Sequence, residues 1–253
     1  MIELKNLSAG YPAKPVLQDI SLSVLRGELI SVIGKNGSGK STLLKTAVGS
    51  IPAKGGEILI DGTPSASLSR QDRAKKIAYL AQGKSTADMT VRQMVLHGRF
   101  PHLSYPRRYS EKDRAIACAA LRQMGLAETA DTPLSALSGG MRQKAHIAMA
   151  LAQDTDYILL DEPTTYLDIT NQFELMTILR TLADGGKGIV AVMHDLPLAF
   201  GFSDRVAVIK DGRLAACDTP RNICGSGIVK AVFGIDLHYS SAERVYHYRY
   251  TPD

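Results

Sequence analysis

The first part of the chain alternates apolar and polar residues in a way that is typical of half-buried β-strands. The alternation runs over Ile2–Leu7 and again over Val16–Leu25, and turn-forming residues 10–15 separate the two runs. This pattern predicts a β-hairpin-like start. Three further apolar runs predict strands, and they cover residues 29–33, 57–60 (before the turn Asp61-Gly62) and 77–80.

The pattern changes after residue 83. Apolar residues recur at helical spacing over Val91–Gly98, Glu111–Met124 and Gly139–Gln153, and prolines separate these segments. Residues 84–150 contain no convincing strand pattern. We therefore predict a helical subdomain, from about residue 84 to residue 153, inserted into the rest of the fold.

Strand patterns return in the last hundred residues. Continuous apolar runs at 157–160 and 188–193 flank a predicted helix over 170–182. Continuously apolar strands separated by helices indicate a parallel sheet covered on both faces. Residues 205–216 predict a strand, a turn and a strand. Beyond residue 220 we expect a short helix and two strands, near 235–238 and 245–248.

Residues 34–41 read Gly-Lys-Asn-Gly-Ser-Gly-Lys-Ser and match the phosphate-loop pattern G-x-x-x-x-G-K-[ST]. The loop joins a predicted strand to a predicted helix, and its glycines tolerate the positive φ values that turn successive N–H groups toward one anion. The helix N-terminus adds partial positive charge. Lys40 would reach the outer phosphates, and the Ser41 hydroxyl would ligate Mg²⁺. The predicted nucleotide-binding residues of this segment are Gly34, Asn36, Gly37, Ser38, Gly39, Lys40, Ser41 and Thr42.

These patterns together predict an α/β fold. We expect a P-loop NTPase core with a parallel sheet and an N-terminal antiparallel β subdomain, built from residues 1–83 and 154–220. The helical subdomain is inserted into this core, and residues from about 221 to 253 form a C-terminal extension. The whole chain, residues 1–253, forms one nucleotide-binding domain.

Two carboxylates end the apolar run Tyr157–Leu160. The carboxyl edge of a parallel sheet is where ligands bind in open α/β folds, so Asp161 is placed to hold Mg²⁺ and Glu162 to act as general base toward water. The pair could instead cap a following helix. The phosphate loop upstream favours the catalytic interpretation.

A second helix start has the features of an anion site. Ser138 fits an N-cap, and Gly139 and Gly140 leave the helix terminus bare. One chain holds one γ-phosphate at its phosphate loop, so this second element would serve the nucleotide of another chain. An ordinary capped helix is the alternative.

The chain contains, in this order, the phosphate loop, Gln82, Leu137–Gly140, Leu160–Glu162, Leu167-Asp168 and His194. This is the order found in ATP-binding cassette (ABC) ATPases, which the chain resembles over essentially its whole length. The resemblance implies a homodimer with ATP and Mg²⁺ at its interface. Tyr11 would stack on adenine, and Gln82 would contact the metal and the attacking water. His194 would hydrogen-bond the γ-phosphate and brace the base. Ser138 and its glycines would grip the partner's ATP, and Asp168 would act across the interface.

Two features complicate this resemblance. From the residues alone, His194 followed by Asp195 is better explained as a cap of the next helix, and only the family context reverses this. The position after Gly140, commonly Gln in the family, is Met141, which removes one amide.

Residues 90–95 and 98–102 resemble those of iron-siderophore, haem and vitamin B12 importers. That resemblance implies a separate membrane permease that docks near residues 82–105, and a substrate-binding protein that this chain meets only indirectly. Two alternatives remain, an exporter ATPase and an ABC ATPase that acts on nucleic acid or the ribosome.

The composition limits the classes of function and partner that the chain can have. Of the 253 residues, 45% are hydrophobic, and the net charge of +5 comes from dispersed basic residues rather than a stripe, so we expect no nucleic-acid partner. No apolar run reaches the roughly 18 residues that a membrane span requires, and the N-terminus lacks an apolar signal core. We expect a cytosolic chain held at the cytoplasmic face of the membrane by its permease. The three cysteines have no metal-binding spacing and indicate reduced thiols.

Overall fold

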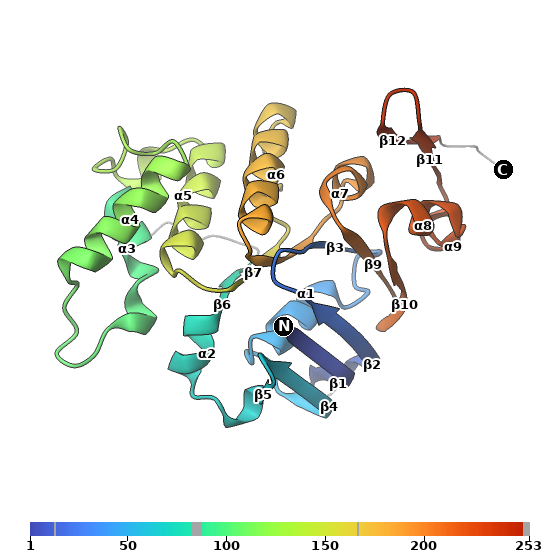
Figure 1. Cartoon of the computed structure of the whole chain (residues 1–253), viewed down its shortest axis with the longest axis horizontal. Helices are drawn as coiled ribbons and strands as arrows, with labels where there is room; N and C mark the ends of the chain where they lie inside the picture. Colours follow the sequence, from blue (N-terminus) through green and yellow to red (C-terminus); the bar gives the residue numbers. More distant parts are fainter. Residues whose placement is uncertain (13, 82–87, 166, 250–253) are drawn as a thin grey trace.

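A six-stranded sheet forms the centre of the protein (Figure 1). The computed structural model describes residues 1–12, 14–81, 88–165 and 167–249. The strand order is β10-β9-β3-β8-β7-β6, in which neighbours from β9 to β6 are parallel and β10 is an antiparallel edge. The strands are β3 (Leu29–Ile33), β6 (Ile77–Leu80), β7 (Tyr157–Asp161), β8 (Gly188–Val192), β9 (Arg205–Lys210) and β10 (Arg213–Asp218).

Both faces of this sheet are buried. Every residue of β3, β7 and β8 is buried, which confirms the prediction from continuous apolar runs. Alternate residues enter different cores because side chains of a strand point to opposite faces. Leu29 and Ile33 pack with the helices on one face, whereas Ile30 and Val32 pack with the N-terminal sheet on the other.

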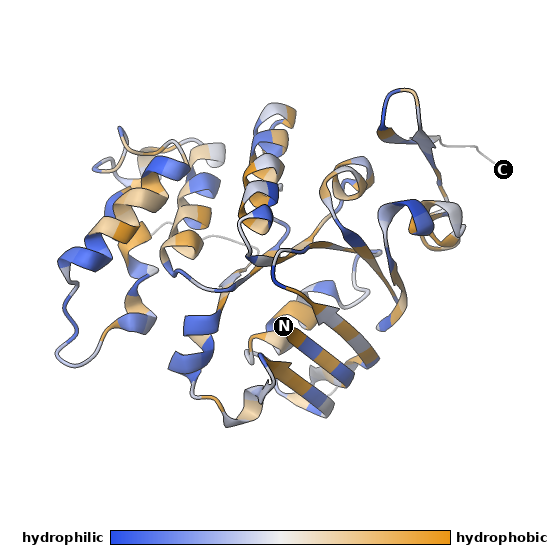
Figure 2. Cartoon of the chain, in the orientation of Figure 1, coloured by the Kyte–Doolittle hydropathy of each residue, from blue (hydrophilic) through white to orange (hydrophobic). Residues whose placement is uncertain are grey.

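The N-terminal sheet is antiparallel, with the order β2-β1-β4-β5. Its strands are β1 (Ile2–Tyr11), β2 (Lys14–Val24), β4 (Ala53–Ile60) and β5 (Thr63–Pro64). Hydrophobic and hydrophilic residues alternate along β1 and β2 (Figure 2), and the inward residues pack with helix α1 (Lys40–Ala47) and the central sheet. The predicted hairpin-like start and the antiparallel β subdomain are therefore confirmed.

The other face of the central sheet is covered by helices. Helices α3 (Val91–His97), α4 (Glu111–Gln123) and α5 (Gly139–Ala152) pack against one another at one end of the molecule (Figure 1), where the sequence predicts helices. Helices α6 (Ile169–Asp184) and α7 (Leu196–Phe202) cover the middle. The last elements are α8 (Pro220–Gly225), α9 (Ile228–Phe233), β11 (Asp236–Ser240) and β12 (Val245–Arg249).

The sequence predicts one short helix beyond residue 220, but the structure has two, α8 and α9. A further helix was also not predicted. Helix α2 (Arg70–Lys76) begins after Ser69, whose hydroxyl accepts a hydrogen bond from the Asp72 N–H. None of its residues is buried, so it lacks the apolar stripe that identifies a helix in a sequence. Three single 3₁₀ turns complete the described structure: η1 (Ser65–Ser67), η2 (Phe100–His102) and η3 (Leu134–Ala136).

Asp61 joins the two sheets at the turn after β4. Its carboxylate accepts hydrogen bonds from the Met1 amine at 2.8 Å and the Tyr157 hydroxyl at 2.7 Å, and from Lys76 Nζ at 3.0 Å. Burial opposes ionisation, but these donors outweigh it and lower the pKa of Asp61 well below its usual range. The chain terminus, β4 and β7 are thereby held together.

A buried ion pair organises the helical end of the molecule. Arg99 Nε lies 2.9 Å from Asp113 Oδ1 on α4, and Arg99 also donates to the Ala152 carbonyl at the end of α5. Their side chains are 5% and 11% exposed. Burial opposes ionisation of Asp113, but hydrogen bonds from Ser110 and Arg99 lower its pKa to about 2. The pair therefore stabilises the fold above the pKa of the unfolded carboxyl and loses this contribution as the pH falls toward 2.

We predict that Asp113→Asn lowers the free energy of unfolding by about 3 kcal/mol at pH 7, because it leaves the Arg99 charge buried without its counter-ion. The difference from wild type should shrink as the pH falls from 4 toward 2. Urea unfolding followed by circular dichroism measures both effects. As a control, Arg92→Met breaks the exposed pair with Asp131 and should cost less than about 1 kcal/mol. Equal losses in the two variants would contradict the prediction.

Candidate functional site

The phosphate loop joins β3 to α1 in the predicted strand–loop–helix arrangement. Gly37 and Gly39 have φ values of +79° and +108°, which L side chains rarely adopt. Gly34 is required for a different reason, because a Cβ there would lie 2.3 Å from the Ile209 carbonyl oxygen. The sequence therefore bends here as predicted, and the first N–H groups of α1 face the open side of the loop.

Lys40 carries a buried positive charge at the start of α1. It is 5% exposed, and its Nζ donates to the carbonyl oxygens of Gly34 at 2.8 Å and Lys35 at 3.1 Å. Burial lowers the pKa of Lys40, and Glu162 and Asp161 partly oppose this shift. Two neutral carbonyls only partly compensate a buried cation, so this position favours an anionic ligand.

Two predicted metal-binding oxygens lie together across β7 and α1. The Ser41 hydroxyl donates to Asp161 Oδ1 at 2.9 Å, and the Tyr79 hydroxyl lies 3.4 Å from Asp161 Oδ2. Burial raises the pKa of Asp161, and the Ser41 hydrogen bond opposes this. A carboxylate and a hydroxyl are hard oxygen donors of the kind that Mg²⁺ prefers.

Glu162 and His194 come together because their strands pair in parallel. Asp161 on β7 lies opposite Val192 on β8, so the residues that follow each strand meet at one edge. His194 Nε2 lies 2.6 Å from Glu162 Oε1. Glu162 has a φ of +55°, a strained conformation for a non-glycine residue that occurs most often at functional sites.

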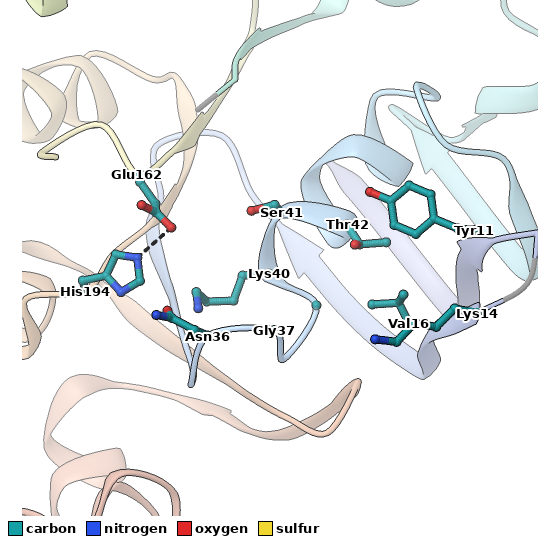
Figure 3. Close-up of a pocket in the computed structure, with 11 residues that line it drawn as sticks. Tyr11, Lys14, Val16, Asn36, Gly37, Lys40, Ser41, Thr42, Glu162 and His194 are labelled. Atoms are coloured by element: carbon teal, nitrogen blue, oxygen red, sulfur yellow. Dashed lines mark ion pairs between the residues drawn. The ribbon is translucent and has the colours of Figure 1, made fainter. Parts of the chain in front are cut away.

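Neither Glu162 nor His194 caps a helix. Helix α6 has Asp168 as its N-cap, and α7 has Asp195, whose carboxylate accepts a hydrogen bond from the Leu198 N–H. This removes the capping alternative for both the Asp161–Glu162 pair and His194. The side chain of His194 instead faces the cavity, together with that of Glu162 (Figure 3).

Lys40, Ser41, Glu162 and His194 line one cavity of about 490 Å³ (Figure 3). The predicted residues Gly34 and Asp161 are not among its lining residues. Tyr11, at the end of β1, lies at the opposite end of the cavity from Glu162 and His194 and is 48% exposed. Lys14 and Val16, from the start of β2, also line it and were not predicted. Both residues belong to β2, and their local sequence pattern does not indicate that they lie beside the cavity. The lining residues are Tyr11, Lys14, Val16, Asn36, Gly37, Gly39, Lys40, Ser41, Thr42, Glu162 and His194.

Several predicted residues lie outside this cavity. Ser138 is the exposed N-cap of α5, and its Oγ accepts from the Met141 N–H at 3.3 Å. Asp168 is exposed at the start of α6, where hydrogen bonds from Asn171 lower its pKa. Gly139 and Gly140 begin α5, where Gly139 is exposed and Gly140 is half-buried.

Ser38 lines a different cavity behind the phosphate loop, of about 350 Å³, beside Lys210. Its buried hydroxyl has no hydrogen-bond partner within the described part of the chain. Gln82 falls in the segment 82–87, outside the described residues.

Comparison with known proteins identifies the family. Residues 17–165 match the family model described as ABC transporter. The petrobactin import ATP-binding protein FpuD of Bacillus anthracis is 38% identical over 95% of this chain and 89% of its own length. The iron(3+)-hydroxamate import ATP-binding protein FhuC of Bacillus subtilis is 39% identical over 93% of this chain and 88% of its own.

Solved structures agree with these relatives. An ABC transporter described as of the metal-chelate type, in an inward-facing conformation, superposes with a TM-score of 0.85 at 26% identity, covering 100% of this chain and 98% of that one. The cassette MJ0796, a dimer bound to ADP and Pi in a post-hydrolysis state, gives a TM-score of 0.77 at 30% identity over 87% and 99% of the two chains. ABC cassettes thus form dimers.

No helix in the described parts of the chain is long and apolar enough to cross a membrane. A cavity lined by a phosphate loop, a buried lysine and a strand-end glutamate is the arrangement that the family uses to bind and hydrolyse ATP. The chain therefore belongs to the ABC transporter family, as an ATP-binding subunit whose ATP hydrolysis is coupled to transport.

Proposed function

We propose that this chain works as a homodimer at the cytoplasmic face of the cell membrane and powers uptake of an iron-siderophore or a related metal chelate, such as haem or cobalamin, through a separate permease. The observation that carries the dimer is the division of the site. The phosphate loop, Glu162 and His194 share one cavity, whereas Ser138 and Asp168 lie exposed outside it. A second chain is needed to bring the two halves together.

One chain supplies the half of the site that binds ATP. Tyr11 stacks on the adenine at one end of the cavity, and Asn36 through Thr42 surround the phosphates. The Lys40 ammonium exchanges its carbonyl partners for phosphate oxygens, which restores full compensation of its buried charge. The N–H groups at the start of α1 add to this attraction.

The Ser41 hydroxyl and the Asp161 carboxylate fit the requirements of a Mg²⁺ site, with Gln82 as a third oxygen donor. When bound, Mg²⁺ would neutralise charge on the β- and γ-phosphates. Asp161 lies within hydrogen-bond distance of both Ser41 and Tyr79, which holds its two oxygens in place before the metal arrives. Burial of Asp161 strengthens its interaction with a cation.

Glu162 and His194 carry the hydrolytic step. Glu162 accepts a proton from the attacking water as general base. His194 hydrogen-bonds the γ-phosphate and braces the base, which it already contacts at 2.6 Å. Gln82 helps to position the same water. The strained backbone at Glu162 fixes the direction of its side chain.

The second chain completes the site. Ser138, Gly139 and Gly140 at the start of α5 bind the γ-phosphate of the partner's ATP, and Asp168 acts across the interface. ATP favours the closed dimer because these contacts exist only there, and loss of the γ-phosphate contact reopens it. Met141 lacks the usual amide, but its backbone N–H and the Ser138 hydroxyl remain.

The permease docks near residues 82–105, where the helical subdomain meets the core. Phe100 and Tyr105 are 49% and 97% exposed there. Beside Phe100 lies a mainly apolar cavity of about 270 Å³, which Arg70, Leu103 and Arg107 also line. Exposed aromatic residues next to an apolar cavity are characteristic of protein interfaces. In this proposal the permease is a separate chain, and any substrate-binding protein acts through it.

The cargo assignment depends on the relatives. FpuD and FhuC are named for petrobactin and iron(3+)-hydroxamate import, and the superposed transporter is described as of the metal-chelate type. Residues 90–95 and 98–102, which lie within the proposed docking region, resemble those of the same class of importers. We therefore favour a metal chelate over the cargo of an exporter or a nucleic-acid substrate.

We predict that Glu162→Gln leaves ATP binding intact but lowers the rate of ATP hydrolysis by roughly 10²–10⁴-fold, since it removes the general base. The variant should accumulate as an ATP-bound dimer. Phosphate release and size-exclusion chromatography with ATP measure these effects. Glu111→Gln, at an exposed position on α4, is the matched control. Near wild-type turnover in Glu162→Gln would show that Glu162 is not the base.

We predict that Phe100→Asp weakens capture of the permease roughly thirty-fold, because a charge replaces an apolar anchor worth about 2 kcal/mol. Nucleotide affinity should not change. The measurement is recovery of the permease from detergent-solubilised native membranes by the tagged chain. Leu25→Asp, which alters an exposed apolar residue between β2 and β3, is the control. Unchanged permease recovery would place the docking surface elsewhere.

We predict that the complex isolated with the tagged chain contains an importer permease. In proteoliposomes, this complex should transport an iron-siderophore, haem or cobalamin only when ATP is supplied on the side of the membrane that carries the tagged chain. The same complex carrying Glu162→Gln should show no uptake. Mass spectrometry and uptake of each labelled chelate test this. Recovery of ribosomal or DNA-repair proteins without a permease would refute the transport function, and an exporter permease would refute the direction.

A further inference from the structure

The C-terminal hairpin presents two chemically different faces. Strands β11 and β12 pair in antiparallel register, with Leu237 opposite Tyr248, His238 opposite His247 and Tyr239 opposite Tyr246. Side chains alternate between the two faces of such a ribbon. One face therefore holds Leu237 and the tyrosines, and the other holds the two histidines.

The aromatic face fixes the hairpin to the rest of the protein. The Tyr246 ring lies 5.3 Å from that of Phe200 on α7, edge to face, and 4.9 Å from the Tyr239 ring. Leu237 is 7% exposed and belongs to the main core. The hairpin accordingly sits beside α7 and α8 at the edge of the molecule (Figure 1). Packing on one face holds the backbone of the other face in place.

The opposite face brings His238 and His247 together. They are directly opposed residues of the two strands, and their ring centroids lie 5.8 Å apart at an interplanar angle of 32°. Both are exposed to solvent. Two neighbouring imidazoles that are open to water offer a pair of nitrogen ligands on one face of the hairpin.

We propose that His238 and His247 form a binding site for a divalent transition-metal ion of the Zn²⁺ class. Imidazole suits Zn²⁺, Cu²⁺ and Ni²⁺, whereas Mg²⁺ and Ca²⁺ prefer oxygen ligands. Two rings that share one tetrahedral Zn²⁺ through bonds of about 2.0–2.1 Å hold their centroids roughly 5 Å apart. The observed 5.8 Å is close to this, and small side-chain rotations close the difference.

The neighbouring groups make this a two-histidine site. Asp236 lies on the same face, two residues before His238, but its carboxylate already accepts a hydrogen bond from Lys230 Nζ at 2.8 Å. Within the described residues, no group of three or more His, Cys, Asp or Glu side chains is placed to hold a metal. Water or a group from another molecule would complete the coordination, so binding is reversible and exchangeable rather than structural.

Zinc titration of the full-length chain tests the site directly. Isothermal titration calorimetry with ZnCl₂, without nucleotide, should show one binding event in wild type that is lost in His238→Gln and in His247→Gln. Both positions are exposed, so the variants keep the fold. His97→Gln, at an exposed histidine on α3, should retain the event. The same Zn²⁺ binding in wild type and in both hairpin variants would overturn the proposal.

A second readout reports the location of the ion. Arg244, in the turn between β11 and β12, is exposed and offers a trypsin site. An ion that bridges the strands stabilises the closed hairpin against the local opening that cleavage requires. Zn²⁺ should therefore slow cleavage after Arg244 in wild type and in His97→Gln, but not in His238→Gln. Equal cleavage rates with and without Zn²⁺ in wild type would contradict a bridging ion.

Discussion

The parallel pairing of β3, β8 and β7 is the constraint on which the site depends. In this register the three strands end at one edge of the sheet, so the residues that follow them become neighbours although they are far apart in sequence. The phosphate loop follows β3, Glu162 follows β7 and His194 follows shortly after β8. A shift of one residue in any strand would move its side chains to the opposite face and separate these groups.

Charge then decides what this edge can bind. Lys40 is buried, and its hydrogen bonds within the described residues go to two carbonyl oxygens, while burial raises the pKa of Asp161 nearby. Both side chains are stabilised when a phosphate and a metal cation bind together. The phosphate compensates the positive charge of Lys40, and the metal cation favours the ionised form of Asp161. The cavity without nucleotide is thus electrostatically incomplete, and this incompleteness is a source of affinity.

The sequence was most informative where one physical rule governs a residue. Continuous apolar runs predicted the buried strands, and glycine spacing predicted the phosphate loop, because burial and positive φ leave few alternatives. It failed at α2, which has no buried residue. Lys14 and Val16 enter the cavity through the tertiary position of the β1–β2 turn, and local patterns carry no information about such proximity. The roles proposed for Ser138 and Asp168 require a second chain, so they do not follow from the geometry of one chain.

Helix α5 connects the proposed docking surface for the permease to Ser138, which is proposed to bind the partner's ATP. Its first residues follow Ser138, and its last turn is tied to the core by Gln153, whose amide donates to the Ala74 and Ile77 carbonyls. The Gln153 carbonyl also lies 2.8 Å from His102 Nε2 in η2, beside the proposed docking surface.

Fourteen residues of α-helix span about 21 Å. A displacement at the docking surface therefore reaches Ser138 through a rigid element whose far end is held by direct hydrogen bonds. The buried Arg99–Asp113 pair, which also contacts the Ala152 carbonyl, makes the same end of α5 resistant to local opening. A connection between the proposed docking surface and Ser138 accordingly runs along α5 and needs no unfolding of the helical subdomain.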